Sequence, residues 1–388
     1  MNKYSIMNKI KVILKNNTMV YNIYCGVFNT IFKILKIWIK PQDNIILMNS
    51  FGGKKYDDSP RVIFEYMKTQ EKYKKYKIYW AFHNPEAYEI TGAEKIKSDT
   101  LKYFIIALKA KYWITNSAIE RGLKFKNKDT IYINTWHGTA IKKMGIDASK
   151  KSFRFQTSKY DVMYAQSQYD IDIFSHAFEL PKEIFALVGL PRNDELYNIK
   201  TDEIREIKEK LKIPYDKKVI LYAPTFREYN RDKDGCIIAP PINLEKWKSK
   251  LSKDYIVLFR AHYEVNNVLG IRDDEFIYNM SDYENLNNLM KISDILVSDY
   301  SSIMFDYSIL DRPIYSFAYD YNEYKEKRGM YIDIETELPN GICKTEDELL
   351  EAISKCDFKE QEEKTKQFSE KYIKSKGNAK KYIDKIIK

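Results

Sequence analysis

Two of the four histidines stand where a protein built on parallel sheets presents its ligand-binding groups. His137 follows the apolar run 131–136 and precedes Gly138, and His262 follows the apolar run 256–260. Histidine titrates near neutral pH, so it can take a proton from an attacking hydroxyl or, as imidazolium, neutralise a phosphate. A lone histidine is more often a core or surface residue, but a place at a strand end beside a glycine favours a functional role. We therefore expect His137 and His262 to be functional residues.

Small polar residues follow the apolar run 295–297, in the order Ser298-Asp-Tyr-Ser-Ser302, and a helical pattern begins directly after them. Backbone N–H groups at a helix start attract anions, and the hydroxyls of Ser301 and Ser302 would add donors to such a site. Simple capping of the helix by Asp299 or Ser301 explains the same residue types, so both interpretations stay open.

Three arginines occupy turns beside predicted strands and helices: Arg227 in Tyr222-Ala-Pro-Thr-Phe-Arg227, Arg192 in Gly189-Leu-Pro-Arg-Asn-Asp194, and Arg61 at the start of a helical pattern. The planar guanidinium matches phosphate geometry, so these turns are candidates for phosphate binding, although a solvated arginine is the simpler alternative for each. Asp232 and Asp234 form an Asp-x-Asp pair in a polar loop. No strand fixes that pair, and neither GxxxxGK[ST] nor GxGxxG occurs, so we expect no metal and no cofactor.

The elements that must position these residues alternate between strands and helices. Strand-length apolar runs lie at 45–48, 78–82, 112–115, 131–134, 162–164, 185–188, 219–222, 256–259, 276–278, 295–297 and 314–317. Helical patterns lie at 60–68, 100–109, 244–251, 283–291 and 302–310, and residues 359–388 read as a charged terminal helix. This alternation predicts an α/β protein with two doubly wound parallel sheets, whose ligands bind beyond the carboxyl ends of the strands. The charged segment 201–212 marks the expected junction, which gives a first domain at 43–205 and a second at 206–388.

Residues 1–42 differ from the rest of the chain because they hold seven lysines and no acidic residue. The uncharged run Met19–Phe32 is shorter than the roughly 20 apolar residues that a membrane-spanning helix needs. On a helix, Lys33, Lys36 and Lys40 share one narrow wedge and apolar residues cover much of the remainder. This pattern favours an amphipathic helix on an anionic membrane surface over a helix docked on the protein's own core.

Composition narrows the class of protein further. The chain has 388 residues with an apolar fraction of 44%, enough for two domains with their own cores. Its four cysteines are far apart, which makes a disulfide framework or a zinc site unlikely to be the basis of folding and favours a reducing compartment. The formal net charge of +10 is largely due to the N-terminal lysines. Because no basic stripe crosses the folded part, we do not expect nucleic acid as a partner.

Taken together, these segments resemble the CDP-glycerol glycerophosphotransferase family of wall teichoic acid synthesis. The similarity covers roughly residues 45–355 and rests on these stretches: Asp58-Ser-Pro-Arg61 with Glu65, Thr135-Trp-His-Gly-Thr139 with Lys142-Lys143, Gly189–Asp194, Tyr222–Arg227, Arg260-Ala-His262, Ser298–Ser302 with Asp306, and Arg328-Gly329 with Tyr331. The resemblance implies a GT-B fold, in which two Rossmann-like domains face a central cleft.

The resemblance also implies roles for single residues. His137 would be the catalytic base in the N-terminal domain, and His262 would act on the donor side. The donor would be held by His262 together with Arg227, Ser301, Ser302 and Asp306, with Asp306 meeting the donor's glycerol. The remaining matched residues would bind the acceptor or support the site: Arg61, Glu65, Thr139, Arg192 and Asp299.

Glycerol phosphate would move from CDP-glycerol to a hydroxyl of an acceptor, a disaccharide linked through a diphosphate to undecaprenol, with release of CMP. The protein would lie peripherally on the cytoplasmic face of the bacterial membrane, and homo-oligomer formation stays open. Family polymerases often carry an extra N-terminal domain, so the length favours a primase or a short-chain enzyme. CDP-ribitol as donor, a glycosyltransferase that uses a nucleotide sugar, and a non-catalytic protein of the membrane surface are the alternatives.

Overall fold

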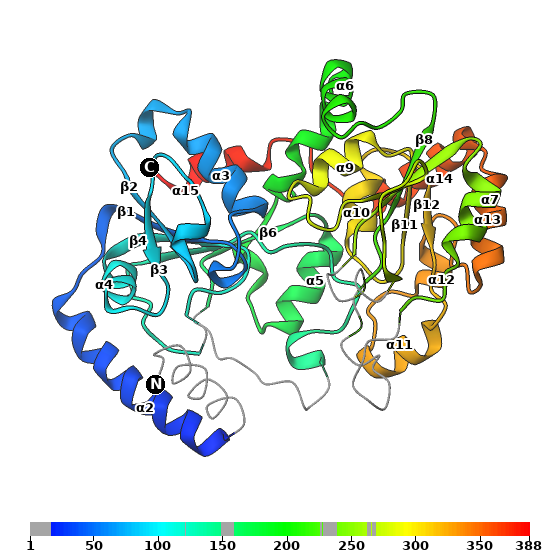
Figure 1. Cartoon of the computed structure of the whole chain (residues 1–388). Helices are drawn as coiled ribbons and strands as arrows, with labels where there is room; N and C mark the ends of the chain where they lie inside the picture. Colours follow the sequence, from blue (N-terminus) through cyan, green and yellow to red (C-terminus); the bar gives the residue numbers. More distant parts are fainter. Residues whose placement is uncertain are drawn as a thin grey trace, which may run out of the picture.

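The computed structural model describes residues 17–120, 122–148, 159–225, 227, 239–261, 265 and 269–388. Two parallel sheets form its framework (Figure 1). The first has seven strands in the order β3-β2-β1-β4-β5-β6-β7, and the second has five in the order β10-β9-β8-β11-β12. In both sheets the order reverses next to the central strand, which is the doubly wound topology that the alternating sequence pattern predicts.

The first sheet is built from strands that are nearly all apolar. Its members are β1 (Gln42–Asn49), β2 (Lys77–Phe82), β3 (Glu94–Lys97), β4 (Ala110–Thr115), β5 (Ile131–Asn134), β6 (Val162–Ala165) and β7 (Phe185–Leu187). Six of the seven were predicted from apolar runs. The edge strand β3 was missed because only Ile96 of its four residues is buried, so it carries no apolar run.

Helices cover both faces of the first sheet: α3 (Asp58–Lys68), α4 (Leu101–Lys109) and α5 (Gln168–Ala177), with the short η6 (Pro191–Tyr197) after β7. Their starts follow ordinary capping chemistry. Asp57 caps α3, and Ser167 caps α5 by accepting from the amide of Asp170. Two of these starts, at α3 and η6, face the second sheet's helices.

The second sheet contains β8 (Lys218–Tyr222), β9 (Tyr255–Phe259), β10 (Ile277–Asn279), β11 (Ile295–Ser298) and β12 (Ile314–Ser316), all predicted. Around it lie α6 (Thr201–Lys210), α7 (Leu244–Leu251), α9 (Leu286–Ile292), α10 (Ile303–Ser308), α11 (Tyr321–Arg328), α12 (Ile334–Glu337) and α13 (Glu346–Ser354). Every residue of β9 and β11 is buried, as is usual for parallel strands with helices on both faces.

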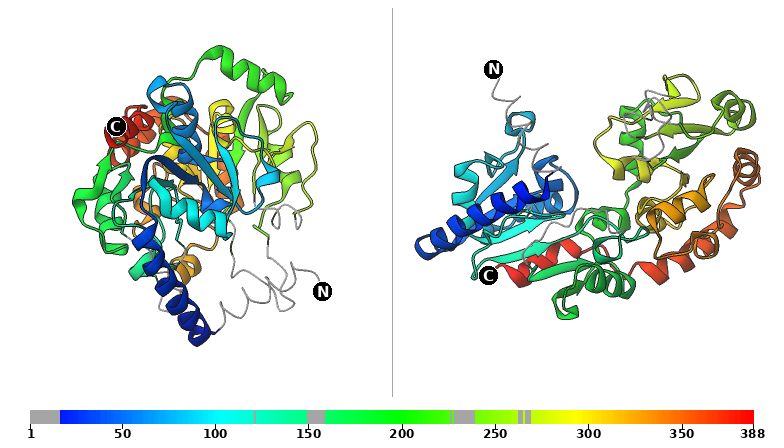
Figure 2. Two further views of the ribbon diagram at one scale, coloured as in Figure 1. Left: turned by 90° about the vertical axis from the view of Figure 1, so that its left-hand side faces the viewer. Right: turned by 90° about the horizontal axis from the view of Figure 1, so that it is seen from below.

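The C-terminal segment returns from the second sheet to the first. The predicted single helix over 359–388 is wrong: α14 (Phe358–Tyr372) ends before Gly377, which has a φ of +71° and packs against Tyr197. The chain then forms η7 (Ala379–Tyr382) and α15 (Ile383–Ile386), whose Ile383 and Ile387 belong to the core of the first sheet. Figure 2 shows this red segment crossing between the two halves. The division into 43–205 and 206–388 therefore stays a prediction.

The N-terminal helix α2 (Thr18–Trp38) has two apolar faces. Phe28, Phe32 and Leu35 pack against the first sheet's core. The opposite face leaves Ile23, Val27 and Ile34 exposed by 54–57%, together with Trp38 at 82%. Residues 1–16 of the expected membrane segment lie outside the described part. Among the described helices, none combines the length and the apolar character that a membrane span needs.

The lysine wedge expected on this helix is only partly exposed. Lys36 turns toward the protein, where its Nζ donates to the carbonyl oxygens of Lys124 at 3.0 Å and Lys126 at 3.3 Å. Lys33 and Lys40 are exposed. The helix is thus docked on its own core through one face, while the second apolar face is exposed in the described structure.

Candidate active site

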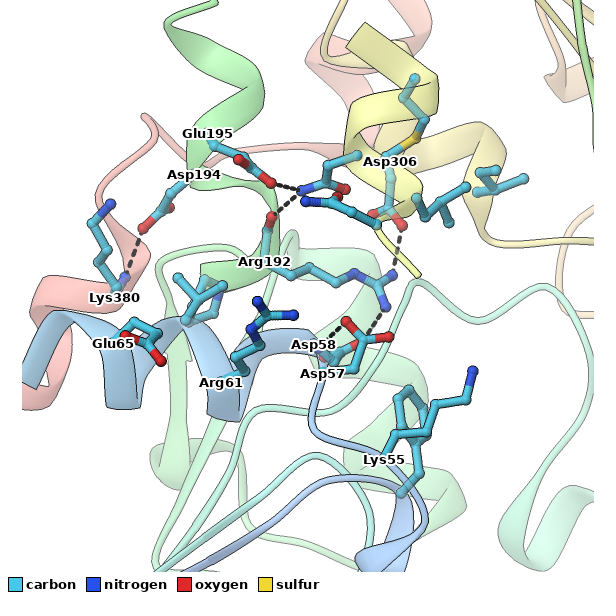
Figure 3. A pocket seen from close by; sticks show the side chains of 18 of the residues that line it. Lys55, Asp57, Asp58, Arg61, Glu65, Arg192, Asp194, Glu195, Asp306 and Lys380 are labelled. Atoms are coloured by element: carbon cyan, nitrogen blue, oxygen red, sulfur yellow. Dashed lines mark hydrogen bonds and ion pairs between the residues drawn. The ribbon is translucent and has the colours of Figure 1, made fainter. Parts of the chain in front are cut away.

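A pocket of about 650 Å³ lies between the helices of the two sheets (Figure 3). One wall consists of α3, η6 and η7, and the other consists of α9, the start of α10 and the residue after β9. Of the residues expected at a site, six line it: Arg61, Glu65, Arg192, Ser301, Ser302 and Asp306. The structure therefore brings residues from three separate sequence stretches to one cavity.

His137 lies at the border of this pocket, at the end of β5. Its ring is 5.8 Å from that of Phe51, a pocket residue, and 4.3 Å from that of Trp136. The backbone of Trp136 has a φ of +54°, a strained value for a bulky residue that turns the chain sharply after the strand. The turn holds the imidazole beside the cavity.

The hydrogen bond of His137 assigns its tautomer. Nδ1 lies 2.7 Å from the carbonyl oxygen of Asn116, which can only accept, so Nδ1 carries the proton and donates. The neutral ring then carries its lone pair on Nε2. Burial lowers the pKa of His137, an effect that Arg192 reinforces and that Asp58 and the Asn116 bond oppose. A neutral, oriented imidazole at pH 7 is the form that a general base requires.

The loop after His137 touches the start of α10 directly. A Cβ built on Gly138, whose φ is +141°, would lie 2.3 Å from Oγ and 2.8 Å from Cβ of Ser302. Any side chain at this position would collide with the opposite wall. Glycine is thus required for the approach of the His137 loop to Ser302, which joins the first sheet's loop to the second sheet's helix.

Ser301 and Ser302 follow β11 after Asp299 and Tyr300, and both line the pocket. Ser301 Oγ accepts from the amide of Ile303 at 3.3 Å, while the side chain of Ser302 makes no capping bond to α10. Ser301 therefore takes part in the capping that was the simpler alternative for Asp299 or Ser301. The Cβ position of Gly138 lies 2.3 Å from Ser302 Oγ and 3.3 Å from Arg192 NH2, so the His137 loop is close to both residues.

Arg192 joins the two walls through a buried ion-pair bridge. Its guanidinium lies 2.6 Å from Asp58 Oδ2 on α3 and 2.5 Å from Asp306 Oδ2 on α10. The second oxygen of Asp306 accepts from Asn193 Nδ2 at 2.6 Å. Burial raises the pKa of Asp306, against the opposing effect of Arg192. Both oxygens of Asp306 are thus held by protein donors, and its expected contact with glycerol stays a prediction.

Thr139 belongs to a buried polar network behind the bridge. Gln166 Nε2 donates to its Oγ1 at 3.0 Å, and Asp170 Oδ2 accepts from the amide of Gln166 at 3.0 Å. Burial raises the pKa of Asp170 to about 7. Thr139 therefore supports the loop after His137 and does not line the pocket, and Asp170 was not found from the sequence because nothing there shows its burial.

Arg227 lies away from the pocket. Its Nε and NH2 donate to the two oxygens of Asp320 at 2.5 and 2.8 Å, and NH1 lies 3.0 Å from Asp299 Oδ2. The guanidinium is 3% exposed and lies 4.6 Å from the ring centre of Tyr319. Arg227 thus ties together the loops after β8, β11 and β12 and does not line the pocket, and its expected contact with the donor stays a prediction.

Asp299, like Arg227, makes its bonds to other parts of the protein. Besides Arg227, its carboxylate accepts from the amides of Thr225 at 2.9 Å and Tyr300 at 2.7 Å. These bonds fix the turn that carries Ser301. His262, Asp232 and Asp234 lie outside the described residues, so nothing is added to their expected roles.

Glu65 and Arg61 lie on the pocket side of α3, one helical turn apart. Glu65 accepts from the hydroxyl of Tyr56 and from Lys68 Nζ at 2.9 Å, and Arg61 lies 5.0 Å from the ring centre of Tyr56. Asp58, Lys55, Arg260 and Lys380 also line the pocket, although they were not selected from the sequence. The sequence could have indicated Asp58 and Arg260, because both lie in the stretches that match the family. No sequence feature pointed to Lys380.

A metal centre is not apparent in the part of the chain that the structure describes, where no group of three or more His, Cys, Asp or Glu residues is placed to hold an ion. The pocket instead combines arginines, lysines and serines with six carboxylates, and a neutral histidine lies at its border. The arginines, lysines and serines are groups that suit a phosphorylated ligand.

Comparison with known proteins identifies the family. Residues 32–388 match the family model of CDP-glycerol:poly(glycerophosphate) glycerophosphotransferases. A teichoic acid poly(glycerol phosphate) polymerase from Staphylococcus epidermidis is 36% identical over 90% of the chain, which spans about half of that relative (51%). A polymerase of the same description from Bacillus spizizenii is 32% identical over 98% of this chain and 100% of its own. A teichoic acid glycerol-phosphate transferase from Staphylococcus aureus is 34% identical over 84% and 87% of the two chains.

Solved structures agree with this assignment. A histidine variant of the wall teichoic acid polymerase TagF, soaked with CDPG, superposes with a TM-score of 0.83 at 31% identity and covers 100% of this chain and 98% of the other. A UDP-GlcNAc 2-epimerase from Neisseria meningitidis, at 13% identity and a TM-score of 0.52 over 88% and 98% of the two chains, shares the fold alone. The expected class of two Rossmann-like domains in a GT-B arrangement is confirmed. The chain belongs to the CDP-glycerol:poly(glycerophosphate) glycerophosphotransferase family, the transferases of teichoic acid synthesis.

Proposed function

We propose that this chain transfers glycerol phosphate from CDP-glycerol to a hydroxyl of a lipid-linked teichoic acid acceptor and releases CMP. The observation that carries the proposal is the meeting of the His137 loop with Ser302 at the edge of the pocket. It puts a neutral base from one wall next to the hydroxyl groups and cations of the other. Family membership supports the same reaction class.

In the proposed step, His137 Nε2 takes the proton of the acceptor hydroxyl. The acceptor oxygen forms a bond to the phosphorus that carries glycerol, and the bond from that phosphorus to the bridging oxygen breaks, so that CMP leaves with the electron pair. Phosphoryl transfer depends mainly on positioning and on neutralising charge. Nδ1, held by Asn116, keeps the lone pair on Nε2 throughout the approach.

The donor would lie on the wall formed by the second sheet. Arg260 there lines the pocket, and its NH1 donates to the carbonyl oxygens of Met280 at 3.1 Å and of Tyr283. Because these partners are neutral carbonyl oxygens and no carboxylate of a described residue forms an ion pair with it within 4.0 Å, Arg260 suits the donor diphosphate together with Ser301 and Ser302. His262, two residues along the chain, keeps its proposed role beside the diphosphate, and CDP-ribitol stays the alternative donor.

The length of the chain does not separate a primase from a polymerase. An extra N-terminal domain does not distinguish polymerases from primases, because this chain matches the Bacillus spizizenii polymerase over the whole length of that polymerase. We propose glycerol phosphate transfer without assigning the number of units added.

For location, we propose that the open face of α2 binds the cytoplasmic surface of the membrane. Ile23, Val27 and Ile34 would enter the headgroup boundary, and the exposed Lys33 and Lys40 beside them would meet anionic lipids. This orientation would keep the pocket near a lipid-linked acceptor.

The test is incubation of the whole chain with CDP-glycerol and a lipid-diphosphate disaccharide, followed by mass spectrometry of the product. Addition of one or more glycerol phosphate units with matching CMP release is the expected result. Parallel reactions with CDP-ribitol and a panel of nucleotide sugars separate the alternatives. Transfer of a sugar, or no consumption of CDP-glycerol by correctly folded protein, would refute the proposal.

A further inference from the structure

Three cations follow one another along the α3 wall of the pocket. Lys55, Arg61 and Lys380, called here the cation row, all line the cavity, and none of their charged side-chain groups forms an ion pair within 4.0 Å with a carboxylate of a described residue. Figure 3 shows them in the order Lys380, Arg61, Lys55 across the view. They come from η7, α3 and the loop before α3, so tertiary structure alone assembles the row.

The acidic residues of the same pocket are already engaged by other groups. Asp58 and Asp306 share Arg192, and Glu65 binds Lys68 Nζ at 2.9 Å. Glu195 lies 2.6 Å from Lys291 Nζ, which is itself 1% exposed. These four carboxylates are therefore engaged by other cations. Asp57 and Asp194 also line the pocket, where Asp57 interacts electrostatically with Lys55 and Arg61, and Asp194 with Lys380, but neither forms an ion pair within 4.0 Å with the row.

The backbone and ring contacts around the row hold two of its members in place. Asp194 accepts from the amides of Ala379 at 2.8 Å and Lys380 at 2.9 Å, which fixes the η7 turn against η6. Arg61 rests over the ring of Tyr56. The η7 contacts fix the backbone of Lys380, and the ring contact positions the guanidinium of Arg61. A guanidinium that is already positioned loses little entropy on binding an anion.

Resting on the function proposed above, we infer that the cation row binds a phosphate group of the acceptor. The donor diphosphate is assigned to the opposite wall, at Arg260 and Ser302, so the cations of the α3 wall indicate a site for a second anion. An acceptor recognised only through sugar hydroxyls would not require it. A phosphate held here would direct the acceptor's hydroxyl toward the His137 loop.

Two parts of the acceptor carry this chemistry. One is a phosphodiester of glycerol phosphate units already added, and the other is the diphosphate that joins the disaccharide to its lipid carrier. The members of the row come from three separate elements along the wall, so they can contact successive parts of a chain-like ligand.

Binding is measured without donor on the whole protein, with two probes: a fluorescent soluble oligomer of glycerol phosphate, and a lipid-diphosphate disaccharide in detergent micelles. Arg61→Gln and Lys380→Gln should each weaken binding of at least one probe about tenfold, since a charge-assisted hydrogen bond is lost. The matched control is Lys381→Gln, which removes a neighbouring exposed cation that does not line the pocket. It should bind both probes as wild type does.

The probe that binds more weakly identifies which phosphate of the acceptor the cation row binds. Weaker binding of the oligomer assigns the row to phosphodiesters of the added chain, and weaker binding of the lipid probe alone assigns it to the carrier diphosphate. Arg61→Lys, which keeps the charge, should recover part of the affinity, and this would not follow from a packing defect. Melting temperatures of all variants check that they fold.

Three outcomes would overturn the inference: wild-type protein that binds neither probe, variants that bind both probes normally, or variants that lose CDP-glycerol affinity to the same degree as acceptor affinity. The proposed reaction is judged separately, by consumption of CDP-glycerol by the wild-type chain. A protein that binds the oligomer but never consumes CDP-glycerol would refute the proposed reaction while retaining the anion site.

Discussion

Gly138→Ala tests whether the close approach of the two walls creates the active site. The added Cβ would lie 2.3 Å from Ser302 Oγ, whereas ordinary contact starts at 3.4 Å, so the His137 loop and α10 would have to separate by about 1 Å. A displacement of this size between reacting groups costs about 10²-fold in rate. We therefore expect kcat to fall about 100-fold. Donor affinity is measured alongside, because Ser302, which the added Cβ would displace, belongs to the proposed donor site.

Backbone strain must be separated from this steric effect, because Gly138 has a φ of +141°. Gly270→Ala is the matched control: Gly270 also has a positive φ, of +59°, but nothing lies within 4 Å of its Cβ position. A double-mutant cycle with Ser302→Gly gives the second control, since that change removes both colliding atoms of Ser302.

The assay is steady-state release of CMP from CDP-glycerol with a lipid-linked acceptor, together with melting temperatures. If contact with Ser302 is the cause, the double variant Gly138→Ala with Ser302→Gly should have a kcat less than about tenfold below that of Ser302→Gly alone. An equal loss in both backgrounds, or a wild-type rate for Gly138→Ala, would refute the argument that the approach to Ser302 places the base.

Three further predictions concern the base, the buried arginine and the membrane face. His137→Ala should lower kcat by about 10²–10⁴-fold at an unchanged melting temperature, and a wild-type rate would exclude His137 as the base. In wild type, the lowered pKa of His137 means that the neutral base is lost only as pH falls through a value below 6.5, so the acidic limb of the kcat/KM profile should lie there. Arg227→Ala should lower the free energy of unfolding by about 3–5 kcal/mol, seen by denaturant titration, because it leaves buried carboxylates unpaired; unchanged stability would contradict the structural role. Val27→Asp with Ile34→Asp should abolish pelleting with anionic vesicles while activity on a soluble acceptor persists, and continued pelleting would place the membrane contact elsewhere.

Local sequence patterns determined most of the framework. Eleven of the twelve strands have an apolar run, because a parallel strand covered on both faces must be apolar along its length. The place of His137 at the end of β5 and of Ser301 after β11 follows from the same rule, since ligand sites form beyond the strand ends. The exception, β3, is an edge strand with a single buried residue, which leaves no pattern to detect.

Tertiary structure decided which of these residues share a pocket. Arg227 looked like a phosphate ligand from its turn, but whether an arginine faces a ligand or a buried carboxylate depends on residues such as Asp320, which is 93 positions away. Lys380 joins the site only because the chain breaks after α14 and returns to the first sheet. A local hydrophobic pattern predicts which face of a strand or helix is buried. The pairing of a charge and the approach of Gly138 to Ser302 depend on contacts between distant segments, which local sequence does not encode.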